Sequence, residues 1–148
     1  MPQFQLTSEI IKRSVARTWD EAKLEWALLH IYEADEPETC LCGHFPIIEL
    51  CILINRKNNK ETTVGNCCVK KFIGLPSDKI FRAIKKIRKD DSKSLNAEAI
   101  QHAFDRKWIN AWEREFYFDI MRKRNLSPKQ LAKKTQINNL ILQRIKKP

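Results

Sequence analysis

Hydrophobic residues recur along this 148-residue chain in two patterns, one typical of strands and one of helices. Residues 24–33 are apolar on both faces of an extended chain, which predicts a central, covered strand that ends in the acidic stretch 34–39. Trp26, Leu28, His30 and Tyr32 are expected to share one face of this strand. Residues 46–55 and 61–65 alternate on either side of the polar stretch 56–60, which predicts a hairpin.

The remaining hydrophobic positions follow helical spacing. Short helices are predicted at 10–22 and at 67–73, the second ending before Gly74. A helix over 77–90 is expected to bury Ile80, Phe81, Ile84 and Ile87. A long helix capped by Asn96 is expected to reach about residue 124, and a final helix is expected to begin after Ser127.

These elements predict an α+β fold in which a small antiparallel sheet is followed by a mainly helical C-terminal half. Residues 1–75 form the expected sheet region, and residues 76–148 form the helical region that packs on it as one compact domain. A Ser127–Gln130 capping box with Pro128 at the first helical position gives the final helix the clearest start in the chain.

All five cysteines lie within residues 40–68, and four of them flank the bends around the predicted hairpin. Cys40 and Cys42 flank one residue and are followed by Gly43, which permits a tight chelating turn. Cys68 follows the second strand, where a helix N-terminus would stabilise a thiolate. We therefore predict a structural Zn²⁺ site with Cys40, Cys42 and Cys68 as ligands.

The fourth zinc ligand remains open from the sequence. His44 is close enough to complete the set, and Cys67 can replace either His44 or Cys68. Cys51 differs because it alternates within a strand, and we expect it to pack in the core. A cysteine cluster at metal-like spacing, without an export signal, is typical of a reducing cytosol rather than a disulfide framework.

The formal net charge of +10 is unevenly distributed. Residues 1–38 contain four Lys or Arg against eight Asp or Glu, whereas residues 39–148 contain 24 against ten. A surface of this kind favours polyanions, so we expect DNA or RNA as a partner and no membrane. The predicted phosphate-contacting residues are Arg56, Lys57, Lys60, Lys70, Lys71, Arg82, Lys85, Lys86 and Lys89.

The succession of chelating turn, hairpin and helix start resembles a treble-clef-like zinc module. More specifically, Cys40-x-Cys42-Gly43 followed by Gly65-Asn66-x-Cys68-Val69-x-x-Phe72 resembles small, mostly uncharacterised zinc proteins of phages and bacterial mobile elements. The resemblance spans roughly residues 24–75. It implies a bacterial cytosol or a phage-infected host as the setting, and it implies no particular activity.

A second resemblance lies near the C-terminus. Residues 121–145, with Leu131, Ala132 and Ile137, are similar to the helix-turn-helix of phage-repressor-like proteins. That resemblance would place a turn at Gln136 and a recognition helix over 138–145. The alternative for the same residues is an ordinary helical hairpin.

Two further functions compete with non-catalytic nucleic-acid binding. The chain can be a phage-type interaction protein that docks on a host or defence protein, since its acidic start and basic remainder suit an adaptor. It can also be a metal-dependent nuclease, for which His30, His44 and Asn66 are the candidate residues, whereas His102 falls among core positions. Only three glycines are present, and none forms a phosphate-cradling loop.

Overall fold

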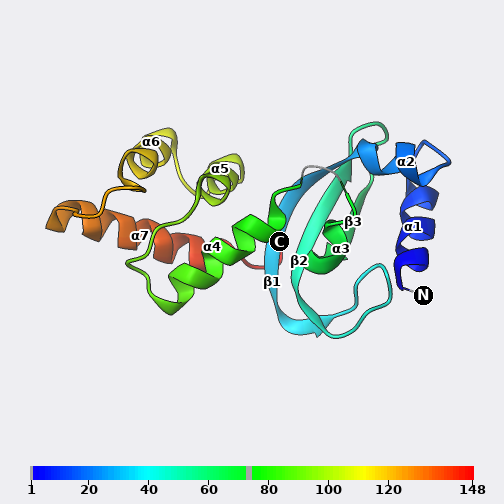
Figure 1. The fold of residues 1–148 in the computed structure, drawn as a ribbon, viewed down its shortest axis with the longest axis horizontal. Helices are drawn as coiled ribbons and strands as arrows, with labels where there is room; N and C mark the ends of the chain where they lie inside the picture. The colour runs from blue at the N-terminus through cyan, green and yellow to red at the C-terminus, as the bar shows by residue number, and fades with distance from the viewer. Residues whose placement is uncertain (1, 73–74) are drawn as a thin grey trace. The chain divides into compact units, whose positions relative to one another are not determined.

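The structure is a computed structural model that describes residues 2–72 and 75–148. The chain divides into two compact units, residues 1–77 with 146–148 and residues 78–145 (Figure 1). The first unit contains a three-stranded antiparallel sheet with short helices, and the described part of the second unit is helical. The predicted α+β class is therefore confirmed, with the first unit ending at Ser77 rather than at residue 75.

The sheet consists of β1 (Trp26–Glu38), β2 (Ile47–Asn55) and β3 (Glu61–Gly65) in the order β1-β2-β3. The hairpin of β2 and β3 is confirmed, but the prediction that residues 24–33 form the central strand is wrong, because β2 is central. Two apolar faces show that a sheet is covered on both sides, and they do not show which strand lies at its edge. The acidic stretch also extends β1 instead of ending it, and Pro37 is tolerated because an edge strand has unpaired N–H positions.

An irregularity in β1 changes which residues share a face. Trp26 lies opposite Asn55 and Leu28 opposite Leu53, but the register shifts between Leu28 and His30. Tyr32 then lies opposite Leu50. Because side chains alternate with a period of two, the shift moves Trp26 and Leu28 away from the face of His30 and Tyr32. The predicted single face of four residues is therefore wrong.

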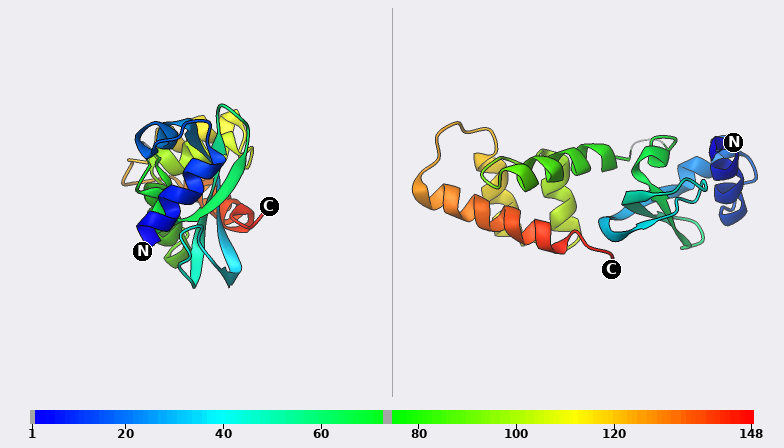
Figure 2. Two further views of the ribbon diagram at one scale, coloured as in Figure 1. Left: turned by 90° about the vertical axis from the view of Figure 1, so that its right-hand side faces the viewer. Right: turned by 90° about the horizontal axis from the view of Figure 1, so that it is seen from below.

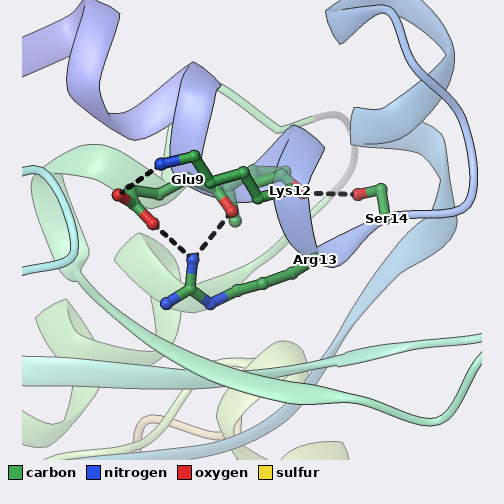
Figure 3. Close-up of polar contacts among 5 residues, drawn as sticks. Glu9, Lys12, Arg13 and Ser14 are labelled. Carbon is green, nitrogen blue, oxygen red and sulfur yellow. Dashed lines mark hydrogen bonds and ion pairs between the residues drawn. The ribbon is translucent and has the colours of Figure 1, made fainter.

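The N-terminal segment forms α1 (Pro2–Arg13), α2 (Trp19–Ala22) and the 3₁₀ turn η1 (Lys23–Glu25), not one helix over 10–22. Helix α1 ends because side chains satisfy its last carbonyls (Figure 3). Arg13 Nη1 donates to the Glu9 carbonyl over 2.9 Å and to its carboxylate over 2.6 Å, and Ser14 Oγ donates to the Ile10 carbonyl over 2.7 Å. The Trp26 indole N–H in turn donates to Ser14 Oγ over 2.9 Å, which ties this end to the sheet.

After β3, the chain forms the short helix α3 (Asn66–Val69) and then α4 (Ser77–Lys89). The first of these helices was predicted over 67–73, but it ends at Val69, so its predicted length is wrong; the predicted end at Gly74 lies outside the described residues. The predicted core positions of α4, Ile80, Phe81, Ile84 and Ile87, are all buried. The stripe predicted from helical spacing is therefore confirmed.

The predicted helix over 96–124 is two helices, α5 (Ala97–Asp105) and α6 (Ala111–Ile120). Asn96 caps α5 as predicted, accepting a hydrogen bond from the Ala99 N–H over 2.9 Å. The break follows Asp105, where Lys107 has a positive φ of 62° and Asn110 begins a new capping box with Glu113. The helical spacing of hydrophobic residues continues across this break, so the spacing alone did not predict that the helix is interrupted.

The final helix, α7 (Pro128–Arg144), begins at the predicted Ser127–Gln130 capping box. It runs through Gln136 without interruption, so the helix-turn-helix reading of residues 121–145 is wrong. Helix α6 contacts both α5 and α7, and residues 121–145 contain a single helix, α7, so a hairpin within these residues is not formed either (Figure 2). Within the described residues, no helix has the length and apolar character needed to cross a membrane.

Candidate metal centre

The first two cysteines lie in a closed turn between β1 and β2. The Gly43 N–H donates to the Cys40 carbonyl over 2.8 Å, and the Cys40 N–H donates to the His44 carbonyl over 2.9 Å. Gly43 has a φ of +93°, a conformation that residues with a Cβ adopt only with strain. A Cβ at this position would also lie 2.9 Å from Gln5 Oε1 of α1. The glycine after the second cysteine is therefore required by backbone geometry, whereas the Gln5 side chain could move aside.

Cys68 follows the last strand of the hairpin. Strand β3 ends at Gly65, which is the N-cap residue of α3, and Cys68 lies within that helix. The Gly65 N–H donates to Cys40 Sγ over 3.1 Å. A backbone N–H directed at a cysteine sulfur stabilises a thiolate, the form of cysteine that binds metal.

The structure brings Cys40, Cys42 and Cys68 together, with their Sγ atoms all within 4.8 Å of one another. Cys40 and Cys42 are buried, and Cys68 is half-buried. Zinc–sulfur bonds of about 2.3 Å in a tetrahedral site place sulfurs roughly 3.8 Å apart, which is compatible with this group. The three thiols can therefore hold a metal ion.

The pKa values of Cys40 and Cys68 are shifted in opposite directions. A hydrogen bond from the Cys68 thiol lowers the pKa of Cys40 to about 5, against the opposing effect of burial. The same hydrogen bond raises the pKa of Cys68, because deprotonation would remove the donor. Cys40 is thus the thiolate of the group, and a metal ion that binds all three sulfurs must displace the Cys68 proton.

The other cysteines and His44 lie outside this group. His44 and Cys67 are exposed, and neither belongs to the cluster of three sulfurs. The fourth ligand therefore stays a prediction. Cys51 is fully buried in β2, and burial raises the pKa of its thiol to about 12, as expected of a core cysteine.

A buried polar cluster adjoins α3 that the sequence did not indicate. Asn66 Nδ2 donates to Glu49 Oε1 over 3.4 Å, and Ser77 Oγ donates to Asn66 Oδ1 over 3.2 Å. Ser77 is fully buried and is the first residue of α4. Asn66 was a candidate for nuclease chemistry, and in the structure its side chain links α3 to β2 and to the start of α4.

The predicted basic residues of the first unit do not gather at one place. Arg56, Lys57 and Lys60 lie at the turn between β2 and β3, whereas Lys70 and Lys71 follow α3. Strand β3, which joins these two places, has five residues and spans about 16 Å. All five side chains are exposed, but they do not form one face at the cysteine group.

The predicted basic residues of the second unit share one helix face. Arg82, Lys85, Lys86 and Lys89 follow an i, i+3, i+4, i+7 spacing on α4, opposite its buried residues, and all four are exposed. Arg82 forms an ion pair with Asp78 over 3.0 Å. Residues 78–145 contain 17 Lys or Arg against eight Asp or Glu, whereas the first unit contains 11 against ten. Almost all of the net charge therefore belongs to the helical unit and not to the cysteine unit.

His30 and His102 do not belong to the cysteine group. His30 is buried in β1, where Nε2 lies 3.3 Å from the Lys146 carbonyl oxygen. His102 is buried in α5, and its ring meets the Trp108 ring edge-on at 5.6 Å. Comparison with known proteins adds no further assignment, because no family model, curated protein or solved structure matches the chain.

Proposed function

We propose that this chain is a non-catalytic zinc protein that binds nucleic acid or a nucleic-acid-associated complex. Cys40, Cys42 and Cys68 hold the zinc with one further ligand, either His44 or Cys67. The exposed basic face of α4 contacts phosphates. The single observation that supports the zinc site best is the meeting of three cysteine sulfurs from two distant turns.

The distribution of charge supports the choice of a polyanionic partner. The helical unit has an excess of nine positive charges over a sequence of 68 residues, whereas the cysteine unit is nearly neutral. Neutralising phosphates with Lys and Arg releases condensed counterions, which makes this kind of binding strong at low salt and weak at high salt. In this proposal a metal ion stabilises the first unit, and the second unit binds the polyanion.

The test measures binding of the zinc-loaded protein to a labelled 20-nucleotide single strand and to the matching duplex at several salt concentrations. The double variant Lys85→Glu, Lys86→Glu should lower affinity at least tenfold and flatten the log–log salt slope by about 0.9 for each phosphate that the variant no longer neutralises. Lys57→Glu, Lys60→Glu makes the same change of charge at the hairpin turn and should have the smaller effect. Equal effects of the two variants would contradict the assignment to α4.

A protein partner is the second candidate, favoured by one specific observation. Phe45 and Ile48 are 60% and 55% exposed, and they directly follow the cysteine turn. Exposed large apolar side chains of this kind mark protein interaction sites when they lie together. Absence of nucleic-acid binding at low salt, together with loss of a captured partner on Phe45→Ser, Ile48→Ser, would favour this function over the first.

A further inference from the structure

The turn between α5 and α6 surrounds a hollow of about 670 Å³. Its lining includes two aromatic rings, Phe104 and Trp108, and four polar side chains, Asp105, Lys107, Asn110 and Glu113. Both rings are half-buried, so each presents part of its surface to the hollow. The volume lies within the 300–1,000 Å³ range of small-molecule sites, and the lining combines aromatic surface with a few polar groups, as such sites do.

Lys107 occupies the least favourable backbone position in this turn. Its φ is 62°, in the left-handed region, and the Trp108 N–H donates to the Ala103 carbonyl over 2.9 Å to close the end of α5. Glycine is the usual residue here because any Cβ costs roughly 1 kcal/mol. A lysine at such a position suggests that its side chain serves a purpose other than ending the helix.

The charges around the hollow leave a cation available. Asp105 accepts a hydrogen bond from Gln101 Nε2 over 2.9 Å. Glu113 accepts one from the Asn110 N–H over 3.0 Å and forms an ion pair with Lys133 over 3.3 Å. Among the described residues, the Lys107 ammonium group has neither a hydrogen bond nor an ion pair. Glu113 is thus paired with a cation, Asp105 keeps its charge, and Lys107 is the lining residue whose ammonium group is available to a phosphate.

A second cation lies beside one of the aromatic rings. The Arg114 guanidinium carbon is 4.1 Å from the centroid of the Phe104 ring. Arg114 also pairs with Glu115 over 3.1 Å. Aromatic surface flanked by cations binds a base and its phosphate together, because the base stacks or packs on the rings while the phosphate meets the ammonium group.

We propose that this hollow binds one nucleotide of a single-stranded nucleic acid, with the phosphate at Lys107 and the base against Trp108 and Phe104. The inference rests on the proposed function and makes it more specific, because the bases of a duplex are stacked and cannot enter. A free mononucleotide offers the same base and phosphate, so the test includes both sources.

The test uses the zinc-loaded full chain and Lys107→Gly, a variant that removes the ammonium group and relieves the backbone strain. Its melting temperature should rise or stay unchanged, while its affinity for a labelled eight-nucleotide single strand should fall at least fivefold. Its affinity for duplex should change less than twofold, because duplex is contacted by α4. Lys107→Arg is the matched control, and it should keep most of the single-strand affinity.

Adenosine monophosphate and inorganic phosphate, added at equal concentrations, distinguish a nucleotide site from a general anion site. Displacement of the single strand by the nucleotide and not by phosphate supports the inference, and equal displacement by both overturns it. If the protein binds the nucleotide tightly but does not bind the single strand, the hollow is still a nucleotide site, and its ligand is a free nucleotide. If Lys107→Gly binds the single strand like the wild type, the inference fails while the proposed function stands. If the wild type binds neither nucleic acid nor the nucleotide at low salt, the proposed function and this inference fail together.

Discussion

The backbone N–H of Gly65 donates to the Sγ atom of Cys40 over 3.1 Å, across 25 residues of sequence. This hydrogen bond joins the end of β3 to the first cysteine of the turn, at the point where Cys68 enters from α3. It places a donor at the sulfur whose pKa is lowered, and it holds the two cysteine-bearing bends together. The geometry of the cysteine group is therefore built by backbone as well as by thiols.

Removing one thiol of the group should release the metal and unfold the sheet unit. A structural zinc in small domains contributes on the order of 10 kcal/mol of apparent binding free energy, comparable to the whole stability of a typical domain. Cys42→Ser and Cys68→Ser should each lower the zinc content of the purified protein from about one ion per chain to almost none. Elemental analysis and far-UV circular dichroism give the two readouts.

Cys51→Ala is the matched control, because Cys51 is a buried cysteine outside the group. It should keep its zinc while losing some core packing. If the serine variants melt like the wild type, or if the wild-type protein contains no zinc and folds equally well with its thiols alkylated, the metal centre is wrong.

The fourth ligand can be identified by cobalt substitution. Co²⁺ bound by three sulfurs and one nitrogen has a different visible spectrum from Co²⁺ bound by four sulfurs. If His44 is the ligand, His44→Ala should change this spectrum and weaken binding by at least about 100-fold, more than loss of a supporting residue does. Cys67→Ser should then leave the spectrum unchanged, and the opposite pair of results would assign Cys67.

The parts of the fold that the sequence predicted well depend on local signals. The Ser127–Gln130 capping box and Pro128 begin α7 in the structure, and the spacing of Ile80, Ile84 and Ile87 predicts the buried face of α4. The turn that carries Cys40 and Cys42 was predicted because a glycine after closely spaced cysteines has few other uses. All of these signals lie within a few residues of the feature that they specify.

The errors arose where distant contacts or weak local signals decide the structure. The break between α5 and α6 carries neither glycine nor proline, and the signal that could have found it is the capping box of Asn110 and Glu113. The register shift in β1 leaves no mark on the alternation of apolar residues, because both faces are covered.

Gly43→Ala should destabilise the sheet unit and weaken metal binding. The backbone at this position has a φ of +93°, which costs a residue with a Cβ about 1–2 kcal/mol, and the new Cβ would meet Gln5 Oε1 at 2.9 Å. Gly65→Ala is the matched control in the same site, because its φ of −68° suits alanine and its nearest neighbour is the end of the Ile47 side chain at 3.2 Å. Thermal melts of both variants with and without zinc measure the difference, and equal losses would contradict this account of Gly43.

Glu25 should make the first unit sensitive to acid. Its side chain is only 3% exposed, yet its carboxylate accepts hydrogen bonds from the N–H groups of Val15 and Ala16 and from Asn55 Nδ2, over 2.7–2.8 Å. Burial opposes ionisation, but these hydrogen bonds outweigh it and lower the pKa of Glu25 below its ordinary value of 4.5. The folded state is therefore favoured above the ordinary pKa, and this contribution is lost as the pH falls through the lowered pKa.

Glu25→Gln should cost about 1.5–3 kcal/mol at pH 7, since hydrogen bonds to a charged group are lost. The variant should also lose less stability than the wild type between pH 5 and pH 3. Urea denaturation across this pH range measures both effects. Glu21→Gln changes an exposed carboxylate nearby and should leave the pH profile unaltered. An unchanged profile in Glu25→Gln would show that other carboxylates cause the acid sensitivity.

Tyr117 should be the main polar support of the helical unit. Its hydroxyl is fully buried, donates to Asn138 Oδ1 over 2.6 Å and accepts from the Leu95 N–H over 3.0 Å, so it joins α6, α7 and the segment before α5. Tyr117→Phe leaves both partners unsatisfied in the core, which should cost about 1–3 kcal/mol for each buried group. Urea denaturation followed by tryptophan fluorescence measures this loss.

The alkaline pH dependence gives Tyr117→Phe a second readout. Burial raises the pKa of Tyr117 to about 12 from an ordinary value of 10. The folded state therefore keeps a proton that the unfolded chain loses, so wild-type stability should fall as the pH rises from about 10 towards 12. Tyr32→Phe is the comparison in the first unit, where the hydroxyl donates to the partly exposed Glu38 over 3.0 Å and burial also raises the pKa of the phenol. Glu38 also pairs with Lys147 over 3.4 Å, so it keeps a partner when the Tyr32 hydroxyl is removed. Tyr32→Phe should therefore lower the free energy of unfolding less than Tyr117→Phe does. Equal losses would show that the Tyr117 hydroxyl does not stabilise its unit more than an ordinary buried hydroxyl.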